Sequence, residues 1–513
     1  MIYYLLSIIS AGLLLLSFPR FDFHYLAWIA LVPFFFAVSG TRGLKRFLCG
    51  YIFGMFFLGA LLWWITVVRY PASLGYFVGA LLFPLIFGVL GMALGSFLRR
   101  TAPFEFLVVP AALWVGMEYL FSLGPLGFPW WVLGYTQSWN PPVAQVASFG
   151  GVYAVSFLIV LVNGIIYALC SGRGRRHQVV LGGVVVALGL VLLAGFWMMS
   201  GEVRGDARIK VAVVQGGFSQ DEKEDPEKFT KIFSAHMEDT IKAVEKHAPD
   251  MVIWSETTAL SEWLIGEVDL LIMLNLLRRL GIHLVAGAYH KEDSKEYNSV
   301  LVLSPEDGYQ GRYDKMHLVP FGEYMPLRAQ ISRIPALAKW VNKNVYEGDT
   351  TPGKNYKVFE TKWGRFSVVI CFESVFAQIS RKMVRRGAEL LMVLTNDAWF
   401  KKTHAADQHA AMAVFRAIEN RRYVIQGASS GISVIVDPYG RRIRTSGLFT
   451  REILNSDVYF RRGLTFYTRF GDVFSWLMLA ISAVGIVIAS RKRSGKKSQS
   501  TAKKKKKPKK KGS

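Results

Sequence analysis

The stretch VVICFES at 368–374 places a lone cysteine, Cys371, directly after a run of β-branched residues. Such a run is typical of a buried strand, so Cys371 is expected where that strand ends, and active sites of α/β sheets gather at strand ends. A thiol there can act as a nucleophile if a base and a cation lie nearby. A cysteine after a buried strand is usually an inert core residue, so this stretch alone does not predict catalysis.

Two other stretches supply the missing groups. MVIWSETT at 251–258 is a similar strand that ends near Glu256, and YDKMHLVPFGEYMP at 313–326 carries Lys315. A carboxylate, an amine and a thiol would then meet where three distant segments end. The plainer interpretations are that Glu256 is a charge at a helix N-terminus and that Lys315 is solvated, because charged side chains are usually exposed.

The composition indicates a hybrid of a membrane bundle and a soluble domain. Of the 513 residues, 52% are hydrophobic, which is high for a soluble protein, whereas 19% charged residues is high for a pure bundle. The net charge of +24 comes in part from the segment after Arg491, which is rich in lysine and lacks acidic residues. A basic run beside a membrane is attracted to anionic lipid, so no nucleic acid partner is expected.

The cysteine and histidine spacings predict no metal and no cofactor. The three cysteines lack the spacing of a zinc site, a redox pair or a disulfide framework. His404 and His409 have no third ligand at metalloprotease spacing.

Apolar segments long enough to cross a bilayer predict eight spans. They lie at 2–18, 22–39, 47–66, 75–98, 103–122, 143–170, 179–199 and 471–490. Basic residues gather in alternate short loops, which the positive-inside rule places in the cytoplasm together with both termini. We therefore predict a membrane domain at 1–200, an extracytoplasmic domain at 205–465, the eighth span at 471–490 and a disordered basic tail at 491–513.

The segment between the last two spans has the composition of an α/β domain. Strands are predicted at 209–215, 250–255, 283–288, 299–304, 366–371, 390–396, 423–429 and 432–437. A helix is expected to begin at Asp225-Pro226, an N-cap followed by a proline, and a second helix at about 405–422. The apolar runs are continuous rather than alternating, which indicates strands covered on both faces and hence a layered α/β sandwich.

These motifs together resemble a known family. WSE at 254–256, the Lys315 stretch and ICFES at 370–374 are similar to the Glu, Lys and Cys motifs of the nitrilase (carbon–nitrogen hydrolase) superfamily. Eight spans with such a domain before the last one resemble its membrane branch, the apolipoprotein N-acyltransferases. The stretches WVGMEYL with Trp114 and Glu118, GFPWWVLGYTQ at 127–137, NDAWF at 396–400, HAAMAVFRAIENRR at 409–422 and FYTRFGD at 466–472 are also similar.

The resemblance implies an α-β-β-α sandwich on the periplasmic side of the bacterial inner membrane. It implies transfer of an acyl chain from a phospholipid donor to the N-terminal amine of a diacylglyceryl-modified apolipoprotein acceptor through a cysteine thioester. The implied roles are Cys371 as nucleophile, Glu256 as general base and acid, Lys315 and the N–H of Phe372 at the oxyanion, Glu323, Glu373 and Asn298 as supporting groups, and Trp130 and Trp131 as lipid contacts.

Several readings stay open at this stage. Phe372, Lys401 and Ser430 stand where the family often has tyrosine, glycine and asparagine, which bears on substrate preference and loop geometry. Glu323 could instead pair with Arg328, and the two tryptophans could be ordinary interfacial residues. A membrane-tethered amidase is an alternative enzyme, although an anchor needs only one span. A transporter or scaffold with an inactive nitrilase domain is the alternative without activity.

Overall fold

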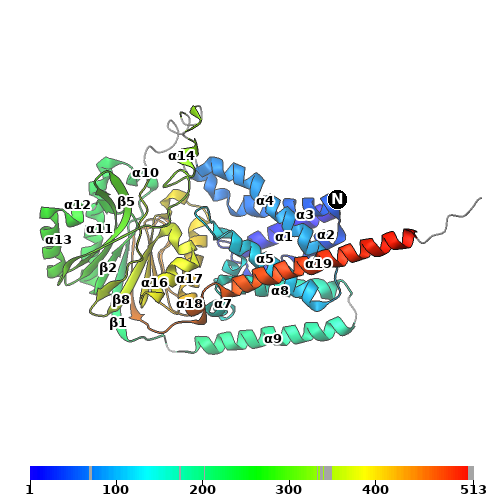
Figure 1. The fold of residues 1–513 in the computed structure, drawn as a ribbon. Coiled ribbons are helices and arrows are strands. Elements are labelled where there is room, and N and C mark those ends of the chain that lie inside the picture. The colour runs from blue at the N-terminus through cyan, green and yellow to red at the C-terminus, as the bar shows by residue number, and fades with distance from the viewer. Residues whose placement is uncertain are drawn as a thin grey trace, which may run out of the picture.

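The chain forms a bundle of apolar helices and an α/β sandwich that lie against each other (Figure 1). The computed structural model describes residues 1–505 except 69–71, 173–174, 202, 261, 332, 336–338 and 340–348. The bundle is built from residues on both sides of the sandwich in the sequence, because α19 (Val473–Lys505) returns to pack on α5 (Val109–Leu120).

The bundle contains long apolar helices and shorter helical segments. The other helices are α1 (Ile2–Ser17), η1 (His24–Trp28), α2 (Val32–Gly40), α3 (Gly43–Leu61), η2 (Trp63–Val67), α4 (Ala72–Phe97), the π-helix η3 (Phe104–Val108), η4 (Pro129–Trp131), η5 (Leu133–Gln137), α6 (Pro141–Ala144), α7 (Ala147–Gly150), α8 (Val152–Cys170) and α9 (Arg175–Met199). Five stretches of the described residues are long and apolar enough to cross a membrane: Gly43–Leu61, Gly75–Phe97, Val152–Cys170, Gly182–Met199 and Val473–Arg491. The predicted spans at 2–18 and 22–39 are shorter apolar helices, and the one at 103–122 is η3 followed by α5.

The structure corrects two predictions about the helices. The single span predicted at 143–170 is broken at Gly151, which has a φ of 67°. A Cβ atom at Gly151 would lie 2.9 Å from the Tyr467 ring, so the chain turns there where a larger residue would not fit. The tail at 491–513 was predicted to be disordered, but α19 continues beyond its apolar part as far as Lys505; residues 506–513 lie outside the described residues.

The sandwich consists of two stacked sheets. The first has the order β13-β1-β2-β4-β5-β6 with β3 paired to β4, and the second has the order β12-β11-β10-β9-β8-β7. The bounds are β1 (Ala207–Gln215), β2 (Met251–Trp254), β3 (Ala259–Leu260), β4 (His283–Glu292), β5 (Lys295–Ser304), β6 (Gly308–Asp314), β7 (Phe359–Thr361), β8 (Gly364–Ile370), β9 (Leu390–Thr395), β10 (Val424–Ala428), β11 (Val434–Val436), β12 (Arg442–Thr445) and β13 (Glu452–Phe460). All eight predicted strands are confirmed.

Helices cover the outer faces of both sheets. On the first sheet lie α11 (Pro226–His247), which begins after Asp225 as predicted, and α13 (Glu267–Leu280), with the short helices α10 (Gln220–Lys223) and α12 (Glu262–Ile265) beside them. On the second sheet lie α16 (Ala377–Arg385) and α17 (Ala405–Asn420), followed later by α18 (Phe466–Phe470); α14 (Arg328–Ile331) lies in the loop after β6. The α-β-β-α sandwich is therefore confirmed.

The helix α17 joins the sandwich to the bundle. All its residues but Asp407 are buried, because it contacts β10 on one side and α7 and η5 on the other. Its buried ion pair Arg416–Glu419, 2.9 Å long, faces the bundle, where Glu419 accepts a hydrogen bond from the backbone N–H of Val152. The hydrogen bonds from Val152 to Glu419 and from Arg416 to the Tyr135 hydroxyl therefore connect this buried pair on α17 to the bundle.

Candidate active site

Cys371 lies at a strained turn at the end of β8. It is the first residue of the short helix η6 (Cys371–Val375), and its φ of 49° is in the left-handed region that residues with a side chain rarely adopt. Its carbonyl oxygen accepts hydrogen bonds from Ser374 Oγ at 2.8 Å and from His409 Nε2 at 3.3 Å. Such strain persists only where the surroundings hold it, and it is typical of functional sites.

Glu256 lies just after β2, and each of its carboxylate oxygens is held separately. Oε1 accepts from Asn298 Nδ2 at 2.7 Å and Oε2 from the backbone N–H of Asn396 at 2.6 Å. Asn298 is on β5, and Asn396 follows β9 in the other sheet. Gly287 of β4 permits this turn, because a Cβ atom there would lie 2.6 Å from the Glu256 Cα.

Lys315 follows β6 and is buried between two carboxylates. Its Nζ lies 2.9 Å from Glu323 Oε1 and 3.4 Å from Glu256 Oε1, and only 1% of its side chain is exposed. The interpretation of Lys315 as a solvated lysine is therefore wrong. The pairing of Glu323 with Arg328 is also wrong, because Arg328 pairs with Asp349 at 2.8 Å.

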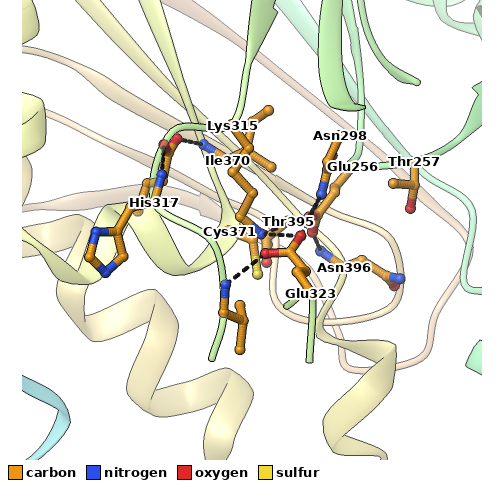
Figure 2. Close-up of polar contacts among 12 residues, drawn as sticks. Glu256, Thr257, Asn298, Lys315, His317, Glu323, Ile370, Cys371, Thr395 and Asn396 are labelled. Atoms are coloured by element: carbon orange, nitrogen blue, oxygen red, sulfur yellow. Dashed lines mark hydrogen bonds and ion pairs between the residues drawn. The ribbon is translucent and has the colours of Figure 1, made fainter. Parts of the chain in front are cut away.

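Figure 2 shows the Cys371 sulfur pointing toward the Lys315 amine and the Glu256 and Glu323 carboxylates. The thiol, amine and carboxylates predicted from three distant stretches thus converge at the ends of strands from both sheets.

Burial controls the charges in this group. Burial and the Glu256 carboxylate raise the pKa of the Cys371 thiol well above its usual value, although the Lys315 ammonium acts in the opposite direction. The Lys315 ammonium favours a thiolate, but burial outweighs its effect. Burial also opposes the charge on Lys315, yet Glu323 and Glu256 raise the pKa of its ammonium. The resting site therefore holds a thiol, an ammonium and a nearby base.

Glu373 ties the cysteine turn to the lysine loop. Its Oε2 accepts from the backbone N–H of Ile370 at 2.8 Å, and its Oε1 accepts from those of Met316 and His317 at 2.7 and 3.1 Å. The Tyr313 hydroxyl donates to both oxygens. Glu373 thus positions the backbone on both sides of the site without being one of the groups around the sulfur.

Lys223 is a buried residue beside the site that the sequence analysis missed. Its buried Nζ donates to the backbone oxygen of Glu256 at 2.8 Å and to Thr257 Oγ1 at 3.0 Å. Burial lowers the pKa of Lys223 to about 8, although Glu256 and Cys371 favour its charge. The capping box of Ser219 and Glu222 predicts the helix α10 that carries Lys223, but no sequence pattern indicates which segment this helix touches.

His409 forms a second buried group that was missed. Its Nδ1 lies 2.9 Å from Asp397, and its Nε2 contacts Ser374 Oγ at 2.7 Å beside the Cys371 carbonyl. Burial opposes the charge, but Asp397 raises the pKa of His409. The histidine considered above as a metal ligand is thus engaged in holding the cysteine turn.

Aromatic side chains form the wall between the site and the bundle. The Phe372 ring stacks on Phe128 at 5.9 Å, and Phe128 stacks on Trp130 at 5.6 Å. Trp130 and Trp131 are both 2% exposed, and Trp130 donates to Gln408 at 2.6 Å. The two tryptophans therefore lie inside the junction of the two halves rather than on an exposed rim.

The structure also shows the local surroundings of three other residues named in the sequence analysis, Glu118, Lys401 and Ser430. Glu118 accepts from Trp114 Nε1 at 2.9 Å and from the Leu133 N–H at 2.8 Å, so it fixes the loop that carries the tryptophans. Lys401 has a φ of 49°, which glycine adopts with less strain. Ser430 donates to the Phe218 carbonyl at 2.8 Å.

Known families and relatives match nearly the whole chain. Residues 10–165 match the family described as Apolipoprotein N-acyltransferase N-terminal domain, and residues 210–462 match Carbon-nitrogen hydrolase. The Apolipoprotein N-acyltransferase of Geobacter metallireducens is 35% identical over 96% of this chain and 96% of its own length. Those of Methylococcus capsulatus and Gloeobacter violaceus are 31% and 27% identical, covering 96% and 94% of this chain and 97% and 93% of their own lengths.

Proposed function

The chain belongs to the apolipoprotein N-acyltransferase family of membrane acyltransferases, and on that premise we propose that it moves a fatty acyl chain from a phospholipid to the N-terminal amine of a diacylglyceryl-modified apolipoprotein. The observation that carries the proposal is the convergence of Cys371 with Glu256 and Lys315 beside a wall of apolar helices. A nucleophile in that position meets substrates whose acyl chains are confined to a membrane at high effective concentration.

In the first half of the reaction, Glu256 takes the proton from the Cys371 thiol as the sulfur attacks the ester carbonyl of the phospholipid. The raised pKa of the thiol supports a base that acts during attack rather than a thiolate formed in advance. The ester C–O bond breaks, Glu256 returns the proton to the leaving oxygen, and a lysophospholipid departs. The acyl group remains on sulfur as a thioester.

In the second half, the amine of the apolipoprotein attacks the thioester carbonyl, and Glu256 removes a proton from the nitrogen. The C–S bond then breaks, the new amide leaves, and the proton returns to sulfur. Lys315 and the backbone N–H of Phe372 stabilise the oxyanion of each tetrahedral state, where the loss of one donor costs about 10²–10³ in rate. Glu323 and Asn298 hold Lys315 and Glu256 in place.

The membrane half gives both substrates access to this site. We propose eight spans with both termini in the cytoplasm, which would place the sandwich at 205–465 on the periplasmic side of the inner membrane. The exposed apolar surface of α9 supports contact of this helix with lipid. The loop of Trp130 and Trp131 would line the path by which acyl chains reach Cys371.

Acyl-mass measurement tests the proposal directly. The purified full chain is incubated with vesicles of a phospholipid that carries a deuterated acyl chain. The protein is then digested, and the masses of its peptides are measured by mass spectrometry. One acyl mass is expected on the peptide of Cys371, and a diacylglyceryl peptide added later should remove it and gain the same mass. Cys371→Ala should remain unlabelled, whereas Cys170→Ala is a matched control at an exposed cysteine and should label normally.

Two results would contradict the proposal. Label that persists in Cys371→Ala would refute the nucleophile. Release of free fatty acid at the rate of acylation, without any acceptor, would instead support a membrane-tethered amidase in which water resolves the thioester.

A further inference from the structure

The cysteine turn and helix α17 behind it share a network of buried polar groups. The His409 imidazole on α17 has its Nε2 atom 2.7 Å from Ser374 Oγ and 3.3 Å from the Cys371 carbonyl oxygen. Its Nδ1 atom lies 2.9 Å from Asp397 Oδ1 and 3.5 Å from Thr395 Oγ1. Each ring nitrogen of His409 therefore has two oxygen neighbours, and the side chains of His409 and Asp397 are only 1% and 0% exposed.

Neither hydroxyl beside His409 points its hydrogen at the ring. The Ser374 hydroxyl donates its single hydrogen to the Cys371 carbonyl at 2.8 Å, and the Thr395 hydroxyl donates its own to Asp397 Oδ1 at 2.8 Å. A carbonyl oxygen and an ionised carboxylate can only accept hydrogen bonds. This arrangement requires a hydrogen on both ring nitrogens of His409, which only the imidazolium has. A neutral ring would leave one nitrogen lone pair facing oxygen lone pairs.

The surroundings of the ring also bear on its charge. Burial opposes the charge, but the Asp397 carboxylate and, from the first sheet, the Glu256 carboxylate raise the pKa of His409. The Trp130 ring of the bundle lies 5.9 Å from the imidazole between ring centres, a range in which a cation is attracted to an indole. His409 is thus a buried cation that is paired with an anion and covered by an aromatic ring.

The carbonyl group that His409 contacts belongs to the same peptide unit as the Phe372 N–H. This carbonyl, of Cys371, accepts from both Ser374 Oγ and His409 Nε2. Hydrogen bonds in a chain strengthen one another by about 10–30% per bond, and bonds from a charged donor are about twice as strong as neutral ones. Because these bonds draw electron density toward the carbonyl oxygen, they make the Phe372 N–H a stronger donor.

We propose that His409 is a positioning residue for acyl transfer, whose imidazolium holds and polarises the Cys371–Phe372 peptide so that the Phe372 N–H stabilises the oxyanion. The inference rests on the proposed function, in which this N–H is one of the oxyanion donors. His409 exchanges no proton with a substrate, because both of its ring nitrogens face oxygens of the chain itself. It acts only through the peptide that it contacts.

The protonation of His409 is measured first, on the full chain in detergent near neutral pH. Histidine with isotope-labelled ring nitrogens is incorporated, and the nitrogens are observed by NMR; the signals that disappear in His409→Gln belong to His409. Two protonated nitrogens are expected. One unprotonated nitrogen would overturn the proposal, because the ring would then be neutral. This measurement does not depend on any reaction of Cys371.

Two rates then separate an effect on the oxyanion from an effect on the thiol. Acylation of Cys371 by a phospholipid passes through an oxyanion, whereas alkylation of the same thiol by iodoacetamide does not. His409→Gln keeps an NH₂ donor but removes the charge. It should lower the acylation rate about tenfold, less than the 10²–10³-fold loss of a direct oxyanion donor, and leave alkylation within about twofold. Equal losses of both rates would overturn the proposal, since His409 would then only hold the thiol.

A second variant and a control complete the test. Asp397→Asn removes the anion beside the imidazolium and should give the same pattern of rates as His409→Gln. His247→Gln, at the end of α11 on the outer face of the first sheet, is the matched control and should change neither rate. Absence of acyl label from the unchanged chain would refute the proposed function, whereas the NMR measurement decides the charge of His409 in either case.

Discussion

Glu373→Gln is the substitution that best tests how the site is held together. The carboxylate of Glu373 is fully buried and accepts hydrogen bonds from three backbone N–H groups and from the Tyr313 hydroxyl. Glutamine keeps the shape but has an NH₂ group in place of one oxygen. If the amide oxygen keeps the hydrogen bonds from the backbone N–H groups of Met316 and His317, the NH₂ group faces the N–H of Ile370. Two donors then point at each other.

The energetic cost follows from this count of bonds. One hydrogen bond to a charged group, about 1.5–3 kcal/mol, is lost, and the bonds that remain fall to the neutral value of about 1 kcal/mol. Burial raises the pKa of Glu373, so removal of its charge recovers part of a desolvation cost. We expect the free energy of unfolding to fall by about 2–4 kcal/mol. Met316 directly follows Lys315, so the amine should also shift, and a displacement of 1 Å in an active site can cost about 10²-fold in rate.

Two measurements check this expectation. Denaturant unfolding in detergent gives the stability, and the rate of acyl label appearing on Cys371 gives the activity. Glu360→Gln, an exposed glutamate on β7, is the matched control and should change neither. The pH dependence of acylation should keep its shape, because Glu373 exchanges no proton with substrate. A stability within about 0.5 kcal/mol of the unchanged chain, together with a normal acylation rate, would refute the reasoning.

Three further predictions concern the charges of the chain. Lys315→Met should lower the acylation rate about 10²–10³-fold, because the oxyanion loses one of its donors; a rate within about threefold of the unchanged chain would contradict this. The Lys223 ammonium loses its proton near pH 8 in the folded chain but only near pH 10.5 in the unfolded chain. The free energy of unfolding should therefore rise by about 3 kcal/mol between pH 8 and pH 10.5. In Lys223→Met this rise with pH should vanish. If unfolding measured at several pH values still shows the rise in the variant, the rise comes from another titrating group and the prediction is wrong. Removal of residues 492–513 should leave acylation within about twofold, because such a basic run acts by weak attraction to anionic lipid; lost activity with normal membrane insertion would contradict this.

Local patterns in the sequence determined the elements of this protein. Runs of β-branched residues identified eight strands, and Asp225-Pro226 marked the start of α11, because strand preference and helix capping act within a few residues. The strands that were missed, β3, β6, β7, β12 and β13, are short or partly exposed and lack such runs. The motifs around Glu256, Lys315 and Cys371 carried enough information to place these residues in one site.

Only the tertiary structure decided what surrounds those residues. Lys223 reaches the Glu256 backbone and His409 reaches the Cys371 carbonyl because separate layers pack together, and no spacing along the chain encodes such contacts. The same packing buries Cys371 so deeply that its pKa rises in spite of the adjacent ammonium. The sequence by itself therefore determined which chemical groups are present. Their charge states and orientations were decided by burial and by contacts between distant segments, since both arise only after the two sheets and the helix bundle have closed around the site.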